Sequence, residues 1–188
     1  MNIGFDLDRI FINTPPLIPP EIVDFFYKEK VDHELKYRIP SRPEQILRII
    51  SHYSFFRQPI VENLNFIKNL VLTNKNKYYL ISSRFGFLKK RTDNLIKEYR
   101  FDKIFNAMYF NYDNKQPHEF KNEIIKKLNL DVLVDDDLQL LEYLTDKNPK
   151  AKFFWLNGKF SKPLKKNLFA IKRLSELFVP HGNGAGFD

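Results

Sequence analysis

Side chains that could do chemistry stand where short apolar runs of this sequence end. The first run, Met1 to Phe5, leads directly into Asp6 and Asp8 in "IGFDLD". The later groups are Ser82, Ser83 and Arg84 after "YYLI", Lys121 in "HEFKNEIIKKLNLDVLVDDD", and Asp135, Asp136 and Asp137 at the end of that stretch. Carboxylates that crowd together repel one another, and a cation among them relieves this repulsion. Because the chain contains no cysteine, oxygen or imidazole must hold such a cation, and oxygen ligands favour Mg²⁺.

Alternating strand and helix patterns are expected to position these groups. The predicted strands are Met1 to Phe5, Tyr78 to Ile81, Val132 to Val134 and Lys152 to Leu156. The predicted helices, which repeat apolar residues at spacings of three and four, are Glu62 to Leu72, Leu88 to Tyr99, His118 to Leu128 and Leu138 to Leu144. This alternation predicts an α/β fold with a Rossmann-like parallel sheet flanked by helices. Its carboxyl edge would bring the polar groups together.

Residues 15–59 interrupt the alternation and are predicted to form a small helical cap inserted after the first strand. Prolines open the segment, a helix is expected to begin near Pro20, and Ser41 with Glu44 has the pattern of a capping box for a second helix. Its aromatic residues are predicted to pack these helices together, with the alternative that one or two face a ligand. They are Phe25, Phe26, Tyr27, Tyr37 and Tyr53, followed closely by Phe55 and Phe56.

The remaining chain divides into a discontinuous core and a tail. Residues 1–14 and 60–180 are assigned to the α/β core, and residues 181–188, which are rich in glycine, to a flexible tail. From Ser161 onward the sequence predicts an amphipathic helix that packs on the sheet. Its apolar stripe comprises Leu168, Ile171, Leu174 and Leu177. A membrane surface or a partner protein is the alternative contact for this basic helix.

The bulk composition limits the class of protein. Apolar residues make up 43% of the chain, enough for a packed interior, and the absence of cysteine excludes disulfides and thiolate metal sites. Neither a signal peptide nor a membrane span is recognisable, so we expect a cytoplasmic protein without a membrane partner. The net charge of +8 is the balance of 31 basic and 23 acidic side chains, and the lysines are spread along the chain. These are interpreted mainly as solvated helix faces, and an anion-attracting surface is the alternative.

The order and spacing of the polar groups resemble the haloacid dehalogenase (HAD) superfamily of phosphohydrolases. That family's pattern is an apolar strand ending in Asp-x-Asp, a second strand ending in Thr or Ser, then a Lys, and finally a strand ending in an acidic pair. Each motif alone also has a structural explanation as a turn or a helix cap. All four in order cover essentially the whole chain, and the stretch from Lys121 to Asp136 is most similar to the nucleotidase-like branch.

The resemblance implies a Mg²⁺-dependent phosphomonoester hydrolase that acts through an aspartyl-phosphate. Asp6 would be the nucleophile, and Asp8 the general acid for the leaving oxygen and then the base for water. Ser82 would hydrogen-bond the phosphoryl oxygens, and Lys121 would neutralise the nucleophile and the transferring group. The expected substrate is a phosphorylated small molecule, with a nucleotide, and hence a 5′-nucleotidase activity, as one candidate.

The same resemblance implies the metal ligands. Mg²⁺ would lie between Asp6, the backbone carbonyl of Asp8 and the late acids. Asp136 is favoured as a direct ligand, Asp135 as a ligand or a water-mediated neighbour, and Asp137 as the cap of the following helix.

Three residues near the motifs are candidates for substrate binding. Ser83 and Arg84 are similar to the small residue and the arginine that often follow the second motif. Arg9 stands where many members have Gly, Asp or Asn, which alters the turn or adds a cation near the phosphate or the cap. Ser82 in place of the commoner Thr keeps the hydroxyl.

Two rival functions stay open. The first is a catalytically weak or inactive HAD-fold protein that binds a phosphorylated ligand in a regulatory role. The second is a polynucleotide-end phosphatase or binder that uses the basic surface, although the scattered lysines make nucleic acid the less favoured partner. No motif in residues 15–59 identifies a leaving group, and no pattern sets the oligomeric state.

Overall fold

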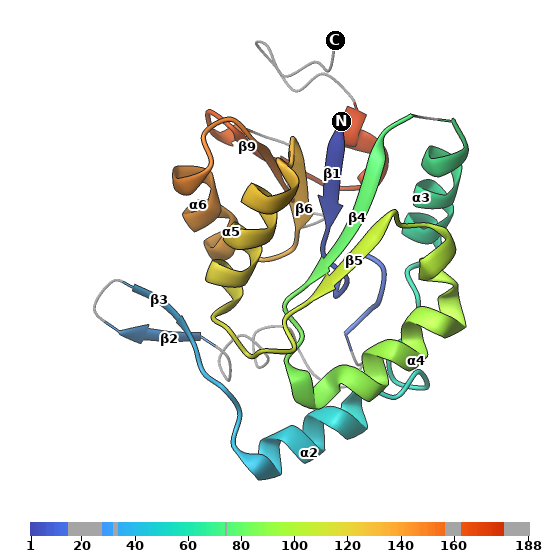
Figure 1. The fold of residues 1–188 in the computed structure, drawn as a ribbon, viewed down its shortest axis with the longest axis vertical. Coiled ribbons are helices and arrows are strands. Elements are labelled where there is room, and N and C mark those ends of the chain that lie inside the picture. Colours follow the sequence, from blue (N-terminus) through green and yellow to red (C-terminus); the bar gives the residue numbers. More distant parts are fainter. Residues whose placement is uncertain (15–27, 32–33, 74, 157–162, 179–188) are drawn as a thin grey trace.

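A seven-stranded sheet forms the centre of the computed structural model (Figure 1), which describes residues 1–14, 28–31, 34–73, 75–156 and 163–178. The strand order is β5-β4-β1-β6-β7-β9-β8, and all neighbouring pairs are parallel except β8 with β9. The strands are β1 (Asn2–Phe5), β4 (Lys77–Ser82), β5 (Ala107–Phe110), β6 (Val132–Asp135), β7 (Lys152–Leu156), β8 (Pro163–Lys165) and β9 (Leu168–Ile171).

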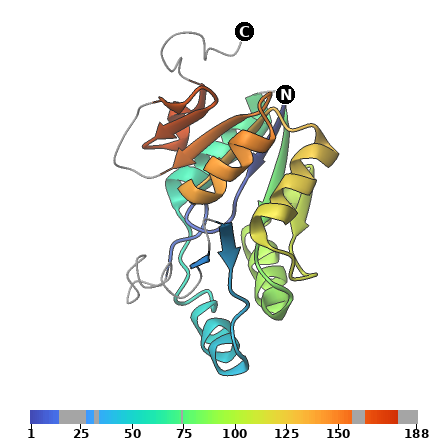
Figure 2. The same cartoon turned by 90° about the vertical axis from the view of Figure 1, so that its left-hand side faces the viewer.

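Helices cover both faces of this sheet, as Figures 1 and 2 show. On one face lie α3 (Val61–Thr73), α4 (Lys89–Tyr99) and the short 3₁₀ helices η2 (Phe101–Lys103) and η3 (Leu174–Phe178), while the 3₁₀ helix η1 (Gly86–Leu88) leads into α4. On the other lie α5 (Pro117–Leu128) and α6 (Leu138–Lys147). The predicted Rossmann-like α/β fold is therefore confirmed, together with the four strands and the four helices on which the prediction rested.

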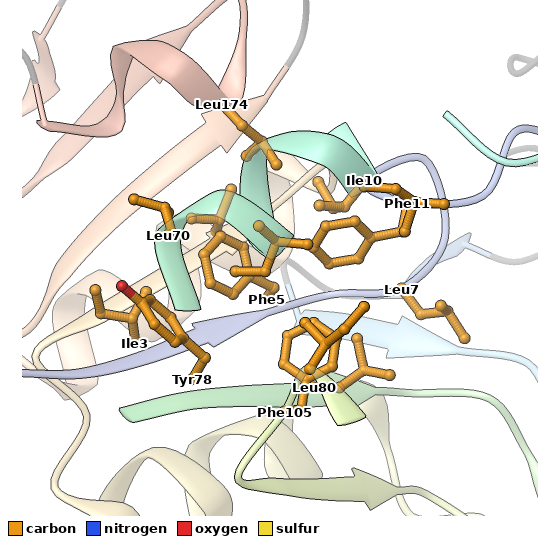
Figure 3. Packing of buried hydrophobic residues seen from close by; sticks show 14 of the residues in the cluster. Ile3, Phe5, Leu7, Ile10, Phe11, Leu70, Tyr78, Leu80, Phe105 and Leu174 are labelled. Atoms are coloured by element: carbon orange, nitrogen blue, oxygen red, sulfur yellow. The ribbon is translucent and has the colours of Figure 1, made fainter. Parts of the chain in front are cut away.

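The core beside β1 is unusually aromatic (Figure 3). The Phe5 ring packs against the rings of Phe11, Tyr78 and Phe105, with centroid separations of 5.8, 6.4 and 6.4 Å. On the opposite face of the same strand, Gly4 lets side chains of the neighbouring strands β4 and β6 approach closely, because a Cβ at Gly4 would lie 2.8 Å from Ile81 Cδ1 and 3.1 Å from Leu133 Cδ1. This tight packing fixes the end of β1, where Asp6 begins.

The described part of the insertion contains a hairpin as well as a helix. β2 (Lys28–Val31) and β3 (Glu34–Tyr37) pair antiparallel, and α2 (Arg42–Ser51) follows. The expectation of a helical cap is therefore wrong for the hairpin, while the helix expected near Pro20 lies outside the described residues. Leu35 and Tyr37 explain the difference, because they are spaced by two and pack toward α6, as in a half-buried strand. The predicted capping box of α2 is present, with the backbone N–H of Ser41 donating to Glu44.

The predicted C-terminal amphipathic helix is wrong. The segment folds instead as β8, β9 and η3. All four residues of β9 are buried, and β9 pairs with β7 at the side of the sheet. The continuous apolar run therefore forms a strand that is buried on both faces. The four-residue strand β5 was also missed, and residues 181–188 of the predicted tail lie outside the described residues. Within the described ranges, no helix has the length and apolar character needed to span a bilayer.

Candidate functional site

The carboxyl edge of the sheet opens into a cavity of about 210 Å³. Every site residue predicted from the sequence lines it, although residues from β1 and β6 are far apart in the chain. These are Asp6, Asp8, Arg9, Ser82, Ser83, Arg84, Lys121, Asp135, Asp136 and Asp137. The structure thus brings the set together, and the chemical roles of its members stay predictions.

Lys121 joins the ends of β1 and β6. It lies on the face of α5 that packs on the sheet, and only 2% of the residue is exposed. Its Nζ donates to Asp6 Oδ1 at 2.6 Å and to Asp135 Oδ2 at 2.5 Å. Burial alone would lower the pKa of Lys121, but Asp135 and Asp6 outweigh it and raise that pKa, so the side chain stays charged.

Three carboxylates next to this lysine form a candidate metal site. Asp6, Asp135 and Asp136 each place an oxygen within 4.8 Å of the others. Burial raises the pKa of Asp6 to about 7, and burial together with Asp135 raises the pKa of Asp136. Lys121 bridges the two buried acids, and the third, Asp136, is half-buried and pairs with Arg9, so two cations face three carboxylates. A hard divalent cation fits this donor set, because its charge would relieve the remaining repulsion and carboxylate oxygens are its preferred ligands.

Asp8 lies in a different electrostatic environment. Arg84 binds it in a forked arrangement, with Nε 2.8 Å from Oδ2 and Nη2 2.7 Å from Oδ1. Arg57 donates to the same Oδ1 at 2.8 Å. Burial alone would raise the pKa of Asp8, but Arg84 and then Arg57 hold it well below its usual range. Two neighbouring aspartates are therefore held in opposite states, Asp6 with a raised pKa and Asp8 ionised.

Arg57 and His52 were not identified from the sequence, and both come from the insertion. Both are buried and line the cavity. His52 Nδ1 donates a hydrogen bond to the carbonyl oxygen of Arg48 at 2.7 Å. The other ring nitrogen, Nε2, then accepts a hydrogen bond from Arg57 Nη2 at 3.0 Å. Burial, followed by the charge of Arg57, keeps the pKa of His52 well below its usual value. Neither residue belongs to a spacing pattern, so no sequence signal marked them.

The chain leaving the insertion is tied to the loop that carries Asp8. The N–H of Asn13 donates to the carbonyl of Gln58, and the N–H of Ile60 donates to the carbonyl of Phe11. Pro59 forms an isolated bridge with Ile12 in the same place. Arg57 thus comes from the insertion but is anchored to the core.

Arg9 forms a turn directly behind Asp8 and reaches the acidic cluster. Its φ of 58° lies in the left-handed region, which explains why small or flexible residues suit this position. Its Nη1 donates to Asp136 Oδ2 at 3.0 Å. Arg9 therefore adds a cation beside the acidic cluster of the cavity.

Three residues with hydroxyl groups, Tyr37, Ser82 and Ser83, also line the cavity. Ser82 is buried at the end of β4, and its Oγ accepts from the N–H of Arg84 at 3.4 Å. The Oγ of Ser83 is buried without a hydrogen-bond partner among the described residues, so it is available to a ligand oxygen. From the hairpin, Tyr37 lines the cavity and donates to Asp137 Oδ2 at 2.8 Å. Asp137 also accepts from the N–H of Leu140, which confirms it as the cap of α6.

Comparison with known proteins shows the fold and no family. No family model and no curated protein sequence matches the chain. Among solved structures, a chain in the structure of the Pnkp1/Rnl/Hen1 RNA repair complex is similar, with a TM-score of 0.52 and 14% sequence identity. The match covers 82% of this chain and 42% of the other, so this chain spans less than half the length of its structural neighbour. At this identity the likeness supports the α/β fold alone.

Proposed function

We propose that this chain is a Mg²⁺-dependent phosphomonoester hydrolase of the haloacid dehalogenase type. The observation that carries the proposal is the position of Lys121 between Asp6 and Asp135, with Asp136 alongside and Asp8 two residues beyond Asp6. A carboxylate nucleophile, a fixed cation beside it and a cluster of hard oxygen ligands are the groups that phosphoryl transfer requires.

In the proposed reaction, a carboxylate oxygen of Asp6 attacks phosphorus, and the bond from phosphorus to the leaving oxygen breaks. Asp8 supplies the proton that the leaving oxygen takes up. Water then attacks the aspartyl-phosphate and loses a proton to Asp8, which releases phosphate and regenerates Asp6. Lys121 neutralises charge on Asp6, while Ser82 and Ser83 offer hydroxyls to the phosphoryl oxygens.

Asp6, Asp135 and Asp136 are the residues that would hold Mg²⁺. When bound, the ion would supply positive charge for the phosphoryl oxygens. Arg9 keeps Asp136 turned toward the cluster through their ion pair.

The arginines around Asp8 place a condition on this mechanism. Asp8 is ionised while Arg84 and Arg57 both bind it, and an ionised carboxylate has no proton to give. A phosphoryl group in the cavity offers these guanidinium groups a second anion. Transfer of either arginine from Asp8 to the substrate would raise the pKa of Asp8 and allow it to act as an acid.

The proposal is tested by phosphate release from p-nitrophenyl phosphate and a panel of nucleoside monophosphates. We expect Mg²⁺-dependent release that EDTA abolishes and that Asp6→Asn lowers by at least 1,000-fold, since it removes the nucleophile. Asp146→Asn, which alters an exposed aspartate, is the matched control and should keep full activity. A phosphoryl adduct on the peptide that contains Asp6 should accumulate during turnover. Release that persists in Asp6→Asn would overturn the assignment.

The second candidate function is a protein that binds a phosphorylated ligand without catalysis. The two arginines that keep Asp8 ionised favour it. If the two arginines keep their contacts with Asp8 when a ligand is bound, no proton donor is available. Mg²⁺ and inorganic phosphate would then raise the melting temperature, while no ester in the panel would be hydrolysed.

A further inference from the structure

One short segment of the insertion connects the cavity to the molecular surface. His52 and Arg57, at its two ends, are buried and line the cavity. Between them, Tyr53 and Phe55 point outward and are 46% and 83% exposed. The Phe55 ring is supported by Phe56, edge to face at 5.3 Å. Two aromatic side chains are therefore exposed close together next to the cavity-lining residues His52 and Arg57.

Basic residues lie beside Tyr53. The Arg91 guanidinium lies 3.4 Å from the centre of the Tyr53 ring, and the exposed Lys89 and Lys90 precede it in the sequence, with the Lys89 ammonium over the ring of Tyr112. These three residues open α4, whose first turn contains no acid. Three consecutive basic side chains repel one another. An anion would relieve this repulsion. Figure 1 shows α2 beyond the carboxyl edge of the sheet, near the start of α4, and α2 contacts η1, which leads into α4.

We propose that Tyr53, Phe55, Lys89, Lys90 and Arg91, here called the rim, bind a single-stranded polynucleotide whose terminal phosphate enters the cavity. This inference rests on the proposed function and names its substrate class. Aromatic faces stack on bases of any sequence, and the basic groups contact the backbone phosphates. A phosphate at a chain end needs the least space to reach Ser83 and Lys121 in a cavity of about 210 Å³, because a mid-chain phosphodiester would bring a nucleotide on each side.

A protein partner is the competing occupant of this surface. The adjoining helix α2 exposes Ile46, Leu47 and Ile50, which is an apolar face of the kind that proteins cover. Two features favour the polynucleotide. The rim is cationic rather than apolar, and its residues continue through His52 and Arg57 into a cavity equipped for phosphate.

The test compares single-stranded RNA and DNA oligonucleotides that carry a 5′-phosphate, a 3′-phosphate or no terminal phosphate. Binding to the full chain is followed by fluorescence anisotropy in EDTA, and phosphate release is followed with Mg²⁺. We expect phosphate-ended strands to bind more tightly than strands without a terminal phosphate, with affinity that falls as salt rises. Their kcat/KM should exceed that of nucleoside monophosphates by at least tenfold. The four phosphorylated strands identify the preferred sugar and end.

Variants separate the rim from the cavity. Phe55→Ala and Tyr53→Ala should each weaken oligonucleotide binding by roughly 5- to 100-fold, the value of one stacked base, and leave hydrolysis of p-nitrophenyl phosphate unchanged. Tyr109→Ala, which removes a ring that pairs with Lys127 outside the rim, is the matched control and should not alter binding.

Three outcomes would overturn the inference. In the first, p-nitrophenyl phosphate is hydrolysed, but kcat/KM for phosphate-ended strands is no higher than kcat/KM for nucleoside monophosphates. In the second, binding survives both rim substitutions. In the third, no oligonucleotide binds and the rim residues instead support self-association. If no ester is hydrolysed at all, the proposed function fails, and the anisotropy measurements still decide whether the rim binds polynucleotides.

Discussion

Lys121 shows how much of the site depends on one side chain. It is the cation shared by Asp6 and Asp135, and all three are buried. A buried ion pair adds little net stability by itself, because its formation must offset the cost of removing both charges from water. Removing one partner is much more costly, because the remaining charge is buried without compensation.

We therefore expect Lys121→Met to lower the free energy of unfolding by about 3 to 5 kcal/mol in EDTA. Urea denaturation measures this change, and Lys126→Met, on the exposed face of the same helix, is the control that should change little. Mg²⁺ should restore part of the loss, since it would neutralise the same carboxylates. Equal stability of the Lys121 and Lys126 variants would show that the two acids do not depend on the lysine.

The sequence predicted the positions of site residues best where those residues follow the end of a strand. Asp6, Ser82 and Asp135 follow apolar runs, and the geometry of a parallel sheet predicts that such positions meet. Arg57 and His52 had no comparable marker, because their position depends on how the insertion returns to the core. Those contacts are backbone hydrogen bonds among residues 11 to 13 and 58 to 60, which side-chain patterns do not encode.

At the scale of elements, the C-terminal segment shows why the helical spacing of its apolar residues gave a wrong prediction. Leu168, Ile171, Leu174 and Leu177 have helical spacing, but Phe169 and Ala170 between them are also buried. A strand covered on both faces hides every residue, so its sequence carries no period of two. The alternating strands and helices from β4 to β7 were predictable because each helix shows one apolar stripe.

Phe169→Asp distinguishes the observed strand from a helix. In β9 the side chain is buried beside β7, so we expect a loss of about 3 kcal/mol or more in the free energy of unfolding. In the predicted helix, Phe169 lies opposite the apolar stripe and the change would cost little. Thermal and urea unfolding measure the difference. Lys172→Asp, at an exposed position three residues later, should cost less than about 0.5 kcal/mol.

Across the whole molecule, the site gives stability an unusual pH dependence. Burial raises the pKa of Asp6 from 3.8 to about 7. Between these values the folded protein holds a proton at Asp6 that the unfolded chain has lost. The stabilising effect of this proton is complete below pH 3.8 and disappears as the pH rises toward 7.

We therefore expect, in EDTA, that the unfolding free energy of the wild type falls relative to that of Asp6→Asn as the pH rises through this window. Mg²⁺ should reduce this loss of unfolding free energy, because it would bind the carboxylates once Asp6 is deprotonated. The rise in melting temperature on adding Mg²⁺ should therefore be larger at pH 7 than at pH 5. Parallel urea titrations at stepped pH provide the measurement. Identical slopes for the two proteins would mean that Asp6 does not titrate in this range.

The anchored end of the insertion matters for how such proteins can be recombined. Because Asn13, Gln58 and Ile60 hold the returning chain against the loop of Asp8, Arg57 stays with the core even though its sequence lies in the insertion. A graft that exchanged residues 15–59 as a block would carry away one of the two arginines that bind Asp8. The unit that can be exchanged safely ends near Ser51, ahead of His52. A designer who wishes to give this scaffold a new specificity should therefore replace the hairpin and α2 and leave the six residues from His52 to Arg57 in place.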